Sequence, residues 1–332
     1  MPEIDRRSLL LAATGALAAP AVMAQAPSKL RINTFQNAIN LALFMGEANG
    51  VFKLAGLDLD IELTPNSEEQ RDKLADGRCD LAYSAIDNAI AMVELARQDV
   101  IIVTGGDTSM MELLVRPEIA SLADMRGRIL AVDRANTAYA LQAKKILKTA
   151  GLLPGRDYEI KELGVARAAA MMTGEGGVVA GMLNPPSSFA AKDKGLRSIG
   201  RAIDLLGPYQ GGGFFAQRSW AAASAAVLER FIAAYIQATR MALDPANRAQ
   251  AIDLLAARLK QPAALATRTY DEALVVPRFG LVPDARLDLE GLRAVLALRA
   301  ELEGQWGGKA PAPERYFDNG YYERALKAVD GR

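Results

Sequence analysis

The sequence has no histidine and only one cysteine, Cys79, among 332 residues. Without an imidazole base, Ser-His-Asp and Cys-His nucleophile pairs are excluded. A structural zinc site that draws its four ligands from cysteine and histidine is excluded as well. A single cysteine cannot form an internal disulfide, and its position beside strand residues indicates a small, buried, apolar side chain. We expect no metal and no other cofactor, although carboxylate chemistry and oxygen-ligated metals stay open.

The sequence also lacks an excess of charge of either sign. Lys+Arg and Asp+Glu both number 39, so the formal net charge is zero. Because a nucleic-acid binder normally carries a basic patch or stripe, and none is visible, we expect no nucleic-acid partner. The composition, 51% hydrophobic and 23% charged, is ordinary for a soluble globular protein. The length suits one large domain or two medium ones.

The first 24 residues have the pattern of a secretory signal peptide. Arg6 and Arg7 precede an apolar run of about 14 residues, shorter than the roughly 20 of a membrane span. Small residues follow, and we expect cleavage after Ala24 and a periplasmic mature protein. The paired arginines resemble a twin-arginine signal, but Asp5 and Leu9 replace its usual residues. Twin-arginine export and ordinary secretion therefore both stay open.

The rest of the chain contains one pattern twice. Residues 30–34, 38–50 and 57–63 predict strand, helix and strand, and residues 128–132, 138–150 and 158–163 predict the same order. Arg31 and Arg128 open the two copies, and 128 − 31 gives an offset of 97. Gly77 and Gly174 give 97 again. An offset of this size favours duplicated lobes over a solenoid, whose units are much shorter.

Two connections between the lobes can be located in this pattern. Residues 113–117 look like the first crossing, and residues 207–213 look like the return. The predicted boundaries are 27–114 plus 214–332 for lobe I, 115–207 for lobe II and 208–213 for a return hinge. Gly211, Gly212 and Gly213 suit a hinge because glycine backbone is permissive; a loose turn is the alternative. Residues 225–243, 246–259 and 289–303 predict C-terminal helices packed on a core.

Several segments together resemble a known family. They are residues 50–52 with 55–57, 74–82, 122–132, 150–152 with 158–164, and 244–248. They resemble substrate-binding proteins of bacterial ABC importers for nitrate, alkanesulfonates, taurine and thiamine-pyrimidine precursors. The resemblance implies a type II periplasmic-binding fold, with two α/β lobes joined by two crossing strands, a small-molecule ligand between them and extra C-terminal helices. It also implies a monomer that delivers its ligand to a membrane permease and its ATPase.

Strand ends and helix starts should line the cleft between such lobes. The expected ligand-binding residues are Gln36, Asn37, Ser84, Asp87, Asn88 and Asp107 in lobe I, Asp133, Asn136, Thr137, Tyr139 and Asn184 in lobe II, and Tyr209 and Gln210 at the return crossing. Helix N-termini near Asn37, Asn88 and Thr137 suit an anionic group of the ligand. The same three residues are also good helix caps, which is the alternative.

Among these residues, Asp87 and Asp107 give the most specific indication of the ligand. If both face the cleft, they indicate a ligand with an amine or several hydrogen-bond donors; a helix cap and a turn are the alternatives. We expect a solute receptor and not an enzyme. An exported enzyme on the same fold, with the two aspartates as acid and base, stays open as the second hypothesis. A receptor that presents its ligand to a membrane sensor is the third.

Overall fold

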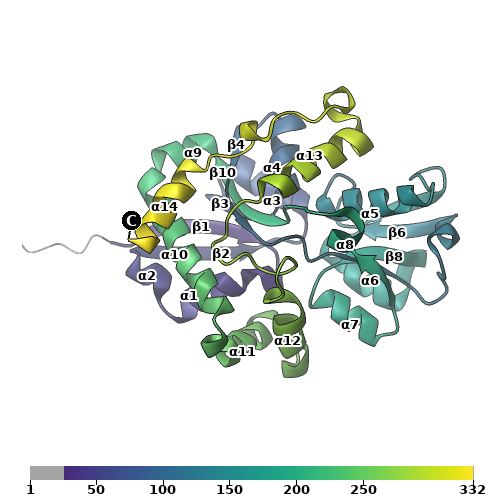
Figure 1. Ribbon diagram of the computed structural model, residues 1–332, viewed down its shortest axis with the longest axis horizontal. Helices are drawn as coiled ribbons and strands as arrows, with labels where there is room; N and C mark the ends of the chain where they lie inside the picture. The colour runs from purple at the N-terminus through teal and green to yellow at the C-terminus, as the bar shows by residue number, and fades with distance from the viewer. Residues whose placement is uncertain (1–25, 332) are drawn as a thin grey trace, which may run out of the picture.

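The chain folds into two α/β lobes that lie side by side (Figure 1). The computed structural model describes residues 26–331. The predicted signal peptide, residues 1–24 with its cleavage site at Ala24, lies outside the described residues. Within residues 26–331, no helix has the length and apolar character needed to cross a membrane.

Lobe I is built on a five-stranded sheet of order β2-β1-β3-β10-β4. Its strands are β1 (Ser28–Thr34), β2 (Leu57–Leu63), β3 (Leu81–Ala85), β4 (Val100–Gly106) and β10 (Gly212–Gln217). Strand β1 pairs in parallel with β2 and β3, whereas β10 runs antiparallel to β3 and β4. The sheet is therefore parallel apart from the strand that returns from the other lobe.

Lobe II has the same arrangement. Its sheet has the order β7-β6-β8-β5-β9. The strands are β5 (Glu112–Val115), β6 (Arg128–Val132), β7 (Tyr158–Glu162), β8 (Val178–Leu183) and β9 (Arg197–Arg201). Strand β3 begins at residue 81 and β8 at residue 178, a difference of 97 that matches the repeat in the sequence. The predicted two-lobed α/β fold is confirmed.

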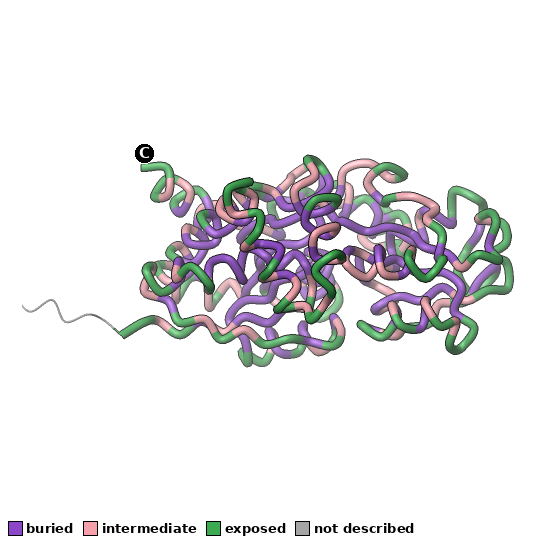
Figure 2. Tube along the Cα trace, turned by 90° about the horizontal axis from the view of Figure 1, so that it is seen from below, coloured by how far each residue is buried: buried purple, intermediate pink, exposed green. Residues whose placement is uncertain are grey.

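Helices cover both sheets (Figure 1). They are α1 (Leu41–Ala48), α2 (Val51–Leu54), α3 (Ser67–Ala75), α4 (Asp87–Glu94), α5 (Ala138–Thr149), α6 (Arg167–Thr173), α7 (Ser187–Asp193), α8 (Ala202–Leu206), α9 (Arg218–Ala223), α10 (Ala225–Leu243), α11 (Arg248–Leu259), α12 (Ala263–Thr269), α13 (Leu289–Glu303) and α14 (Gly320–Asp330). The limits of α10 and α13 are those predicted from their apolar periodicity. Figure 2 shows buried chain through the middle of each lobe.

The crossings differ in two respects from the expectation. Residues 112–114 pair with β8, so lobe II begins at Glu112 and not at residue 115. Gly212 and Gly213 already belong to β10, and none of the three predicted hinge glycines has a positive φ. A Cβ on Gly212 would lie 2.3 Å from Asp107 Oδ2, and one on Gly213 would lie 2.4 Å from the Thr104 carbonyl oxygen. Close packing, and not a permissive backbone, requires glycine here.

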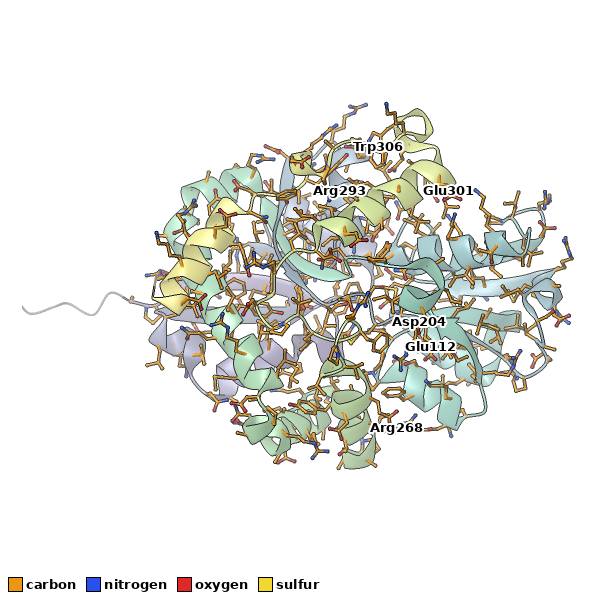
Figure 3. All side chains as sticks on the ribbon, in the orientation of Figure 1. Glu112, Asp204, Arg268, Arg293, Glu301 and Trp306 are labelled. Carbon is orange, nitrogen blue, oxygen red and sulfur yellow. The ribbon has the colours of Figure 1, made fainter. Side chains whose placement is uncertain are left out.

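The lobes are in contact on two sides of the crossing strands. On one side, Lys145 of α5 lies 2.6 Å from Glu301 of α13, which Figure 3 labels at the end of α13 near lobe II. On the other side, Arg268 of α12 lies 2.8 Å from Asp193 of α7 and stacks on Phe189. Helices α12 and α13 belong to the C-terminal part of lobe I, which follows β10 in the chain. The C-terminal helices therefore hold lobe II against lobe I at both places.

Candidate functional site: the cavity between the lobes

A cavity of about 110 Å³ lies between the two lobes. Its walls come from the segments that follow β1, β3, β6 and β8 and from the two crossings. These are the carboxyl ends of parallel strands, where open α/β sheets place their ligands. The volume is several times the ~10–15 Å³ that one water molecule needs, so the cavity can hold a small organic molecule.

Nine of the thirteen expected ligand-binding residues line this cavity. They are Gln36, Asn37, Ser84, Asn88 and Asp107 from lobe I and Asp133, Thr137, Tyr139 and Asn184 from lobe II. Gly211 and Gly212 of the return crossing line it as well. Parallel strands end at the same edge of their sheet, so the residues that follow those strands lie close together. Their contact with a solute stays a prediction.

Asp87 and Tyr209 do not line the cavity, and the expectation that they contact the solute does not hold in this structure. Asp87 is fully buried at the start of α4, where its Oδ1 lies 3.5 Å from Nε of Arg299 on α13. The Tyr209 hydroxyl donates to Asp87 Oδ2 at 2.7 Å. Burial raises the pKa of the Asp87 carboxyl, and the nearby Arg299 guanidinium opposes that rise. Asp87 therefore has its counter-charge inside the protein.

Asn136 and Gln210 also lie outside the cavity wall. The Asn136 carbonyl oxygen accepts a hydrogen bond from Arg299 Nη2 at 2.8 Å, which turns the residue toward α13. Gln210 is buried in the return crossing, where its Nε2 donates to the Gly212 carbonyl at 2.7 Å and its Oε1 accepts from the Asp288 amide at 2.8 Å. The Gln210 side chain joins backbone segments, and the Asn136 side-chain oxygen accepts from Arg71 Nη1 at 3.5 Å.

Asn37, Asn88 and Thr137 were alternatively expected to cap helices, and only one of them does so with its side chain. Asn37 accepts a hydrogen bond from the Ile39 amide at 3.2 Å, so it does cap the turn that follows β1. Thr137 makes no such bond; its hydroxyl donates to the Arg134 carbonyl. Asn88 lies inside α4 and donates to the hydroxyl oxygens of Ser67 and Ser84 at 3.2 and 3.1 Å. Asn88 and Thr137 thus line the cavity without capping a helix through their side chains.

Asp107 lines the cavity from the first crossing and is only 5% exposed. Its two carboxylate oxygens accept from the Ser109 amide at 2.8 Å and the Gly212 amide at 2.9 Å. Burial raises the pKa of this carboxyl to about 6, although these backbone donors oppose the rise. The carboxylate ties the two crossings together and shares its charge with backbone donors.

Arg167, a residue that the sequence analysis missed, carries the positive charge of the cavity. It opens α6, is only 7% exposed, and its guanidinium carbon lies 3.9 Å from the centre of the Tyr139 ring. Nη1 donates to the Gly164 carbonyl at 2.7 Å and Nε to the Met182 carbonyl at 3.3 Å. Two of its five N–H donors are thus used. Among the residues that the structure describes, no carboxylate forms an ion pair with it.

Asp133 carries the second buried negative charge of the cavity and is 1% exposed. Its Oδ2 accepts hydrogen bonds from the hydroxyl and the amide of Ser67, a lobe I residue that the sequence analysis also missed. Its Oδ1 is buried and has no hydrogen-bond partner within residues 26–331. A buried polar atom normally has a partner, so a ligand donor is the natural candidate for this one.

The cavity therefore offers charges of both signs and a set of neutral hydrogen-bonding groups. The Tyr139 hydroxyl donates to Asn184 Oδ1 at 3.1 Å, which fixes two of the neutral groups on the lobe II wall. Apolar side chains such as Phe35, Met110 and Val165 complete the lining. No group of three or more carboxylate or cysteine side chains in the described part of the chain could hold a metal ion.

Comparison with known proteins agrees with this architecture. No curated protein matches the sequence. The nitrate-binding protein NrtA from Synechocystis PCC 6803 superposes with a TM-score of 0.76 at 12% identity, over 92% of this chain and 90% of its own. The alkanesulfonate-binding protein SsuA from Xanthomonas axonopodis pv. citri gives 0.71 at 20% identity, over 88% and 98%.

An enzyme shares the fold too. The desulfurization enzyme DSZB superposes with a TM-score of 0.60 at 16% identity, over 91% of this chain and 99% of its own. These identities are low, so the structural likenesses establish the two-lobed fold alone. The family model described as NMT1/THI5 like matches residues 37–249, which is more than half of the sequence. The chain belongs to the NMT1/THI5-like family.

Proposed function

We propose that this protein is the exported solute-binding component of an ABC importer, which closes on a small organic acid and delivers it to a membrane permease. The observation that carries the proposal is Arg167. Its guanidinium is buried in the wall of an interlobe cavity and has no internal counter-ion in residues 26–331. Because burying an uncompensated charge is strongly unfavourable, the charge is retained for a partner from outside the chain.

The family and its neighbours support the same role. Structural neighbours include binding proteins for nitrate and for alkanesulfonates, and both solutes are anions. Sulfonates, taurine, nitrate and pyrimidine precursors are the classes we propose to test first. The mature chain would work as a monomer in the periplasm, with residues 1–24 removed after Ala24. The receiving partner would be a permease with its ATPase, and a membrane sensor is the alternative.

The two-carboxylate enzyme is a weaker candidate. It requires Asp87 and Asp107 to face one substrate, and only Asp107 lines the cavity. One observation keeps an enzyme worth testing: the pKa of Asp107, raised to about 6, suits a carboxyl that exchanges protons near neutral pH. Recovery of the bound solute unchanged after long incubation with the protein would count against this candidate, and a converted product would favour it.

The test of the binding role has two stages. Mass spectrometry of small molecules released by denaturing the purified protein identifies the solute, and thermal shift confirms it. A ligand at a hundred times its Kd adds about 2.7 kcal/mol to the free energy of unfolding, so a true ligand gives a clear shift. We expect Arg167→Met to lose this shift and Arg134→Gln, whose side chain is partly buried and lies outside the cavity wall, to keep it. No shift with any anionic solute would contradict the proposal.

A further inference from the structure

We propose that Asp133 makes closure of the lobes depend on a solute that carries a hydrogen-bond-donating nitrogen in addition to its acidic group. This inference rests on the proposed binding function and deepens it. It narrows the solute class to amphoteric molecules: an acid at one end, and an amine, amide or ring N–H at the other. It also assigns Asp133 as the residue that binds the nitrogen donor of the solute.

The contact between Asp133 and Ser67 joins the two lobes. Asp133 follows β6 of lobe II, whereas Ser67 begins α3 of lobe I. The Ser67 amide donates to Asp133 Oδ2 at 3.3 Å, and the Ser67 hydroxyl donates to the same oxygen. Separation of the lobes breaks both bonds. Asp133 is therefore at once a part of the cavity wall and a part of the interlobe contact.

Ser67 is held so that its hydroxyl proton faces Asp133. Asn88 Nδ2 donates to the Ser67 hydroxyl oxygen at 3.2 Å, and Asn88 Oδ1 in turn accepts from Arg71 Nη1 at 3.0 Å. The Arg71 guanidinium thus orients the Asn88 side-chain amide, whose nitrogen donates to the Ser67 hydroxyl oxygen. The only proton of the serine hydroxyl is left for Asp133. The lobe I side of the contact is ready before the lobes meet.

The second oxygen of Asp133 explains why a solute is needed. In this structure Oδ1 is buried and has no partner within the described residues. In an open protein, water can reach both carboxylate oxygens. If the lobes close without a ligand donor, Oδ1 loses its hydrogen bonds to water and gains no new partner. This loss is unfavourable for a charged group. A solute N–H at Oδ1 removes that penalty and allows closure.

The same penalty does not arise at Asp107, although it is also a buried carboxylate in the cavity wall. Both of its oxygens already accept backbone hydrogen bonds, from the Ser109 and Gly212 amides. Asp133 is the carboxylate with a free acceptor, and Arg167 is the cation with free donors. A solute that satisfies both must carry an acidic group and a nitrogen donor in the same molecule.

The experiment uses matched pairs of acids that differ only in the nitrogen. The probes are ω-amino-alkanesulfonates and ω-amino-alkanoates of two to five carbons, each paired with the unsubstituted acid of the same length. Kd values are measured by titration calorimetry for the wild type, Asp133→Asn, Ser67→Ala and the control Glu68→Gln. Glu68 pairs with Arg134 across the same junction but lies outside the cavity wall. Circular dichroism establishes that each variant is folded.

We expect the wild type to prefer the amino member of the best pair by about tenfold or more, as for a buried charge-assisted hydrogen bond. Asp133→Asn should remove this preference, and Ser67→Ala should weaken both members of the pair to the same extent. Glu68→Gln should keep the preference. Equal binding of both members by the wild type would overturn the inference and leave the proposed function standing. No binding by any probe, with no acid among the co-purified molecules, would overturn both.

Discussion

Two buried charge clusters lie within this molecule, and they differ in how their charges are balanced. In the first, behind the cavity, Asp87 and Arg299 are both fully buried and lie 3.5 Å apart, and Tyr209 donates a hydrogen bond to Asp87. In the second, on the cavity wall, Arg167 and Asp133 are also buried, but neither forms an ion pair within residues 26–331. Burial of a charge does not by itself mark a binding site.

The difference shows what to look for in a two-lobed receptor. Breaking a cluster that is balanced internally destabilises the fold, because the remaining charge loses its partner within the chain. A cluster that is not balanced lowers stability, and we propose that this one is retained for a ligand. Asp87 looked from the sequence like the residue that grips a solute, and it belongs to the first kind. Arg167 was not singled out from the sequence, and it belongs to the second.

The largest expected effect comes from breaking the balanced cluster. Arg299→Met leaves the Asp87 carboxylate buried without its counter-charge and should lower the free energy of unfolding by about 3–5 kcal/mol. The double variant Asp87→Asn with Arg299→Met should recover much of this loss, because no uncompensated charge remains. Urea unfolding followed by circular dichroism measures both. If the single variant is as stable as the wild type, the cluster does not hold the fold.

The next effect concerns Asp107, whose carboxyl has a pKa raised from 3.8 to about 6. A raised pKa means that the folded state binds the proton more tightly than the unfolded chain does. This contribution to stability is complete below about pH 3.8 and is lost as the pH rises through about 6. The difference of about two pKa units corresponds to roughly 3 kcal/mol.

The measurement for Asp107 is the free energy of unfolding of the wild type and of Asp107→Asn from pH 4 to pH 7. The wild type should lose more stability than the variant over this range. Asp87, whose pKa is also raised, keeps its own contribution in both proteins and cancels in the difference. Parallel curves for the two proteins would show that folding does not shift the pKa of the Asp107 carboxyl.

A smaller change in stability, with a clear change in binding, is expected from the unbalanced cluster. Arg167→Met removes a buried cation that has no internal counter-ion, so the unliganded protein should stay within about 1 kcal/mol of the wild type or become more stable. Affinity for the acidic solute should fall by about tenfold to a hundredfold. Parallel unfolding and calorimetric titrations separate the two effects. A loss of stability as large as that of Arg299→Met would remove the distinction between the clusters.

The smallest effect belongs to the contact between α13 and α5. Glu301 lies 2.6 Å from Lys145 and 2.9 Å from Lys148, and these side chains are about one-third exposed. Glu301→Gln should therefore lower stability by less than about 1 kcal/mol. Because salt screens exposed pairs, the difference from the wild type should shrink at 1 M salt. A difference that is independent of salt would mean that Glu301 contributes through packing and not through its charge.

The sequence predicted the lobes and much of the cavity because these follow from local rules. Strand ends in parallel sheets lie at one edge, so Ser84 and Asn184 could be placed together without knowledge of their contacts. The offset of 97 residues predicted a second copy of the same sheet. The limits of α13 followed from its apolar spacing, in which Arg299 was the single break.

What the sequence could not predict is which side chains meet across the lobes. Arg299 looked like a break in an apolar face, and only its contact with Asp87, more than two hundred residues earlier, explains it. Arg167 stands in a run of alanines, where nothing nearby indicates a binding role; a lone arginine among small residues was the only available signal. The glycines at the return crossing were assigned to flexibility, but the reason for them is the proximity of Asp107 and Thr104.

The most direct test of the account is a crystal structure of the protein with its co-purified solute. We predict that an acidic group of the solute lies within hydrogen-bond distance of Arg167 Nη2. We also predict that a solute N–H lies within the same distance of Asp133 Oδ1, with Asp87 still paired to Arg299. A solute that leaves Arg167 and Asp133 without partners, or that contacts Asp87 in their place, would contradict it.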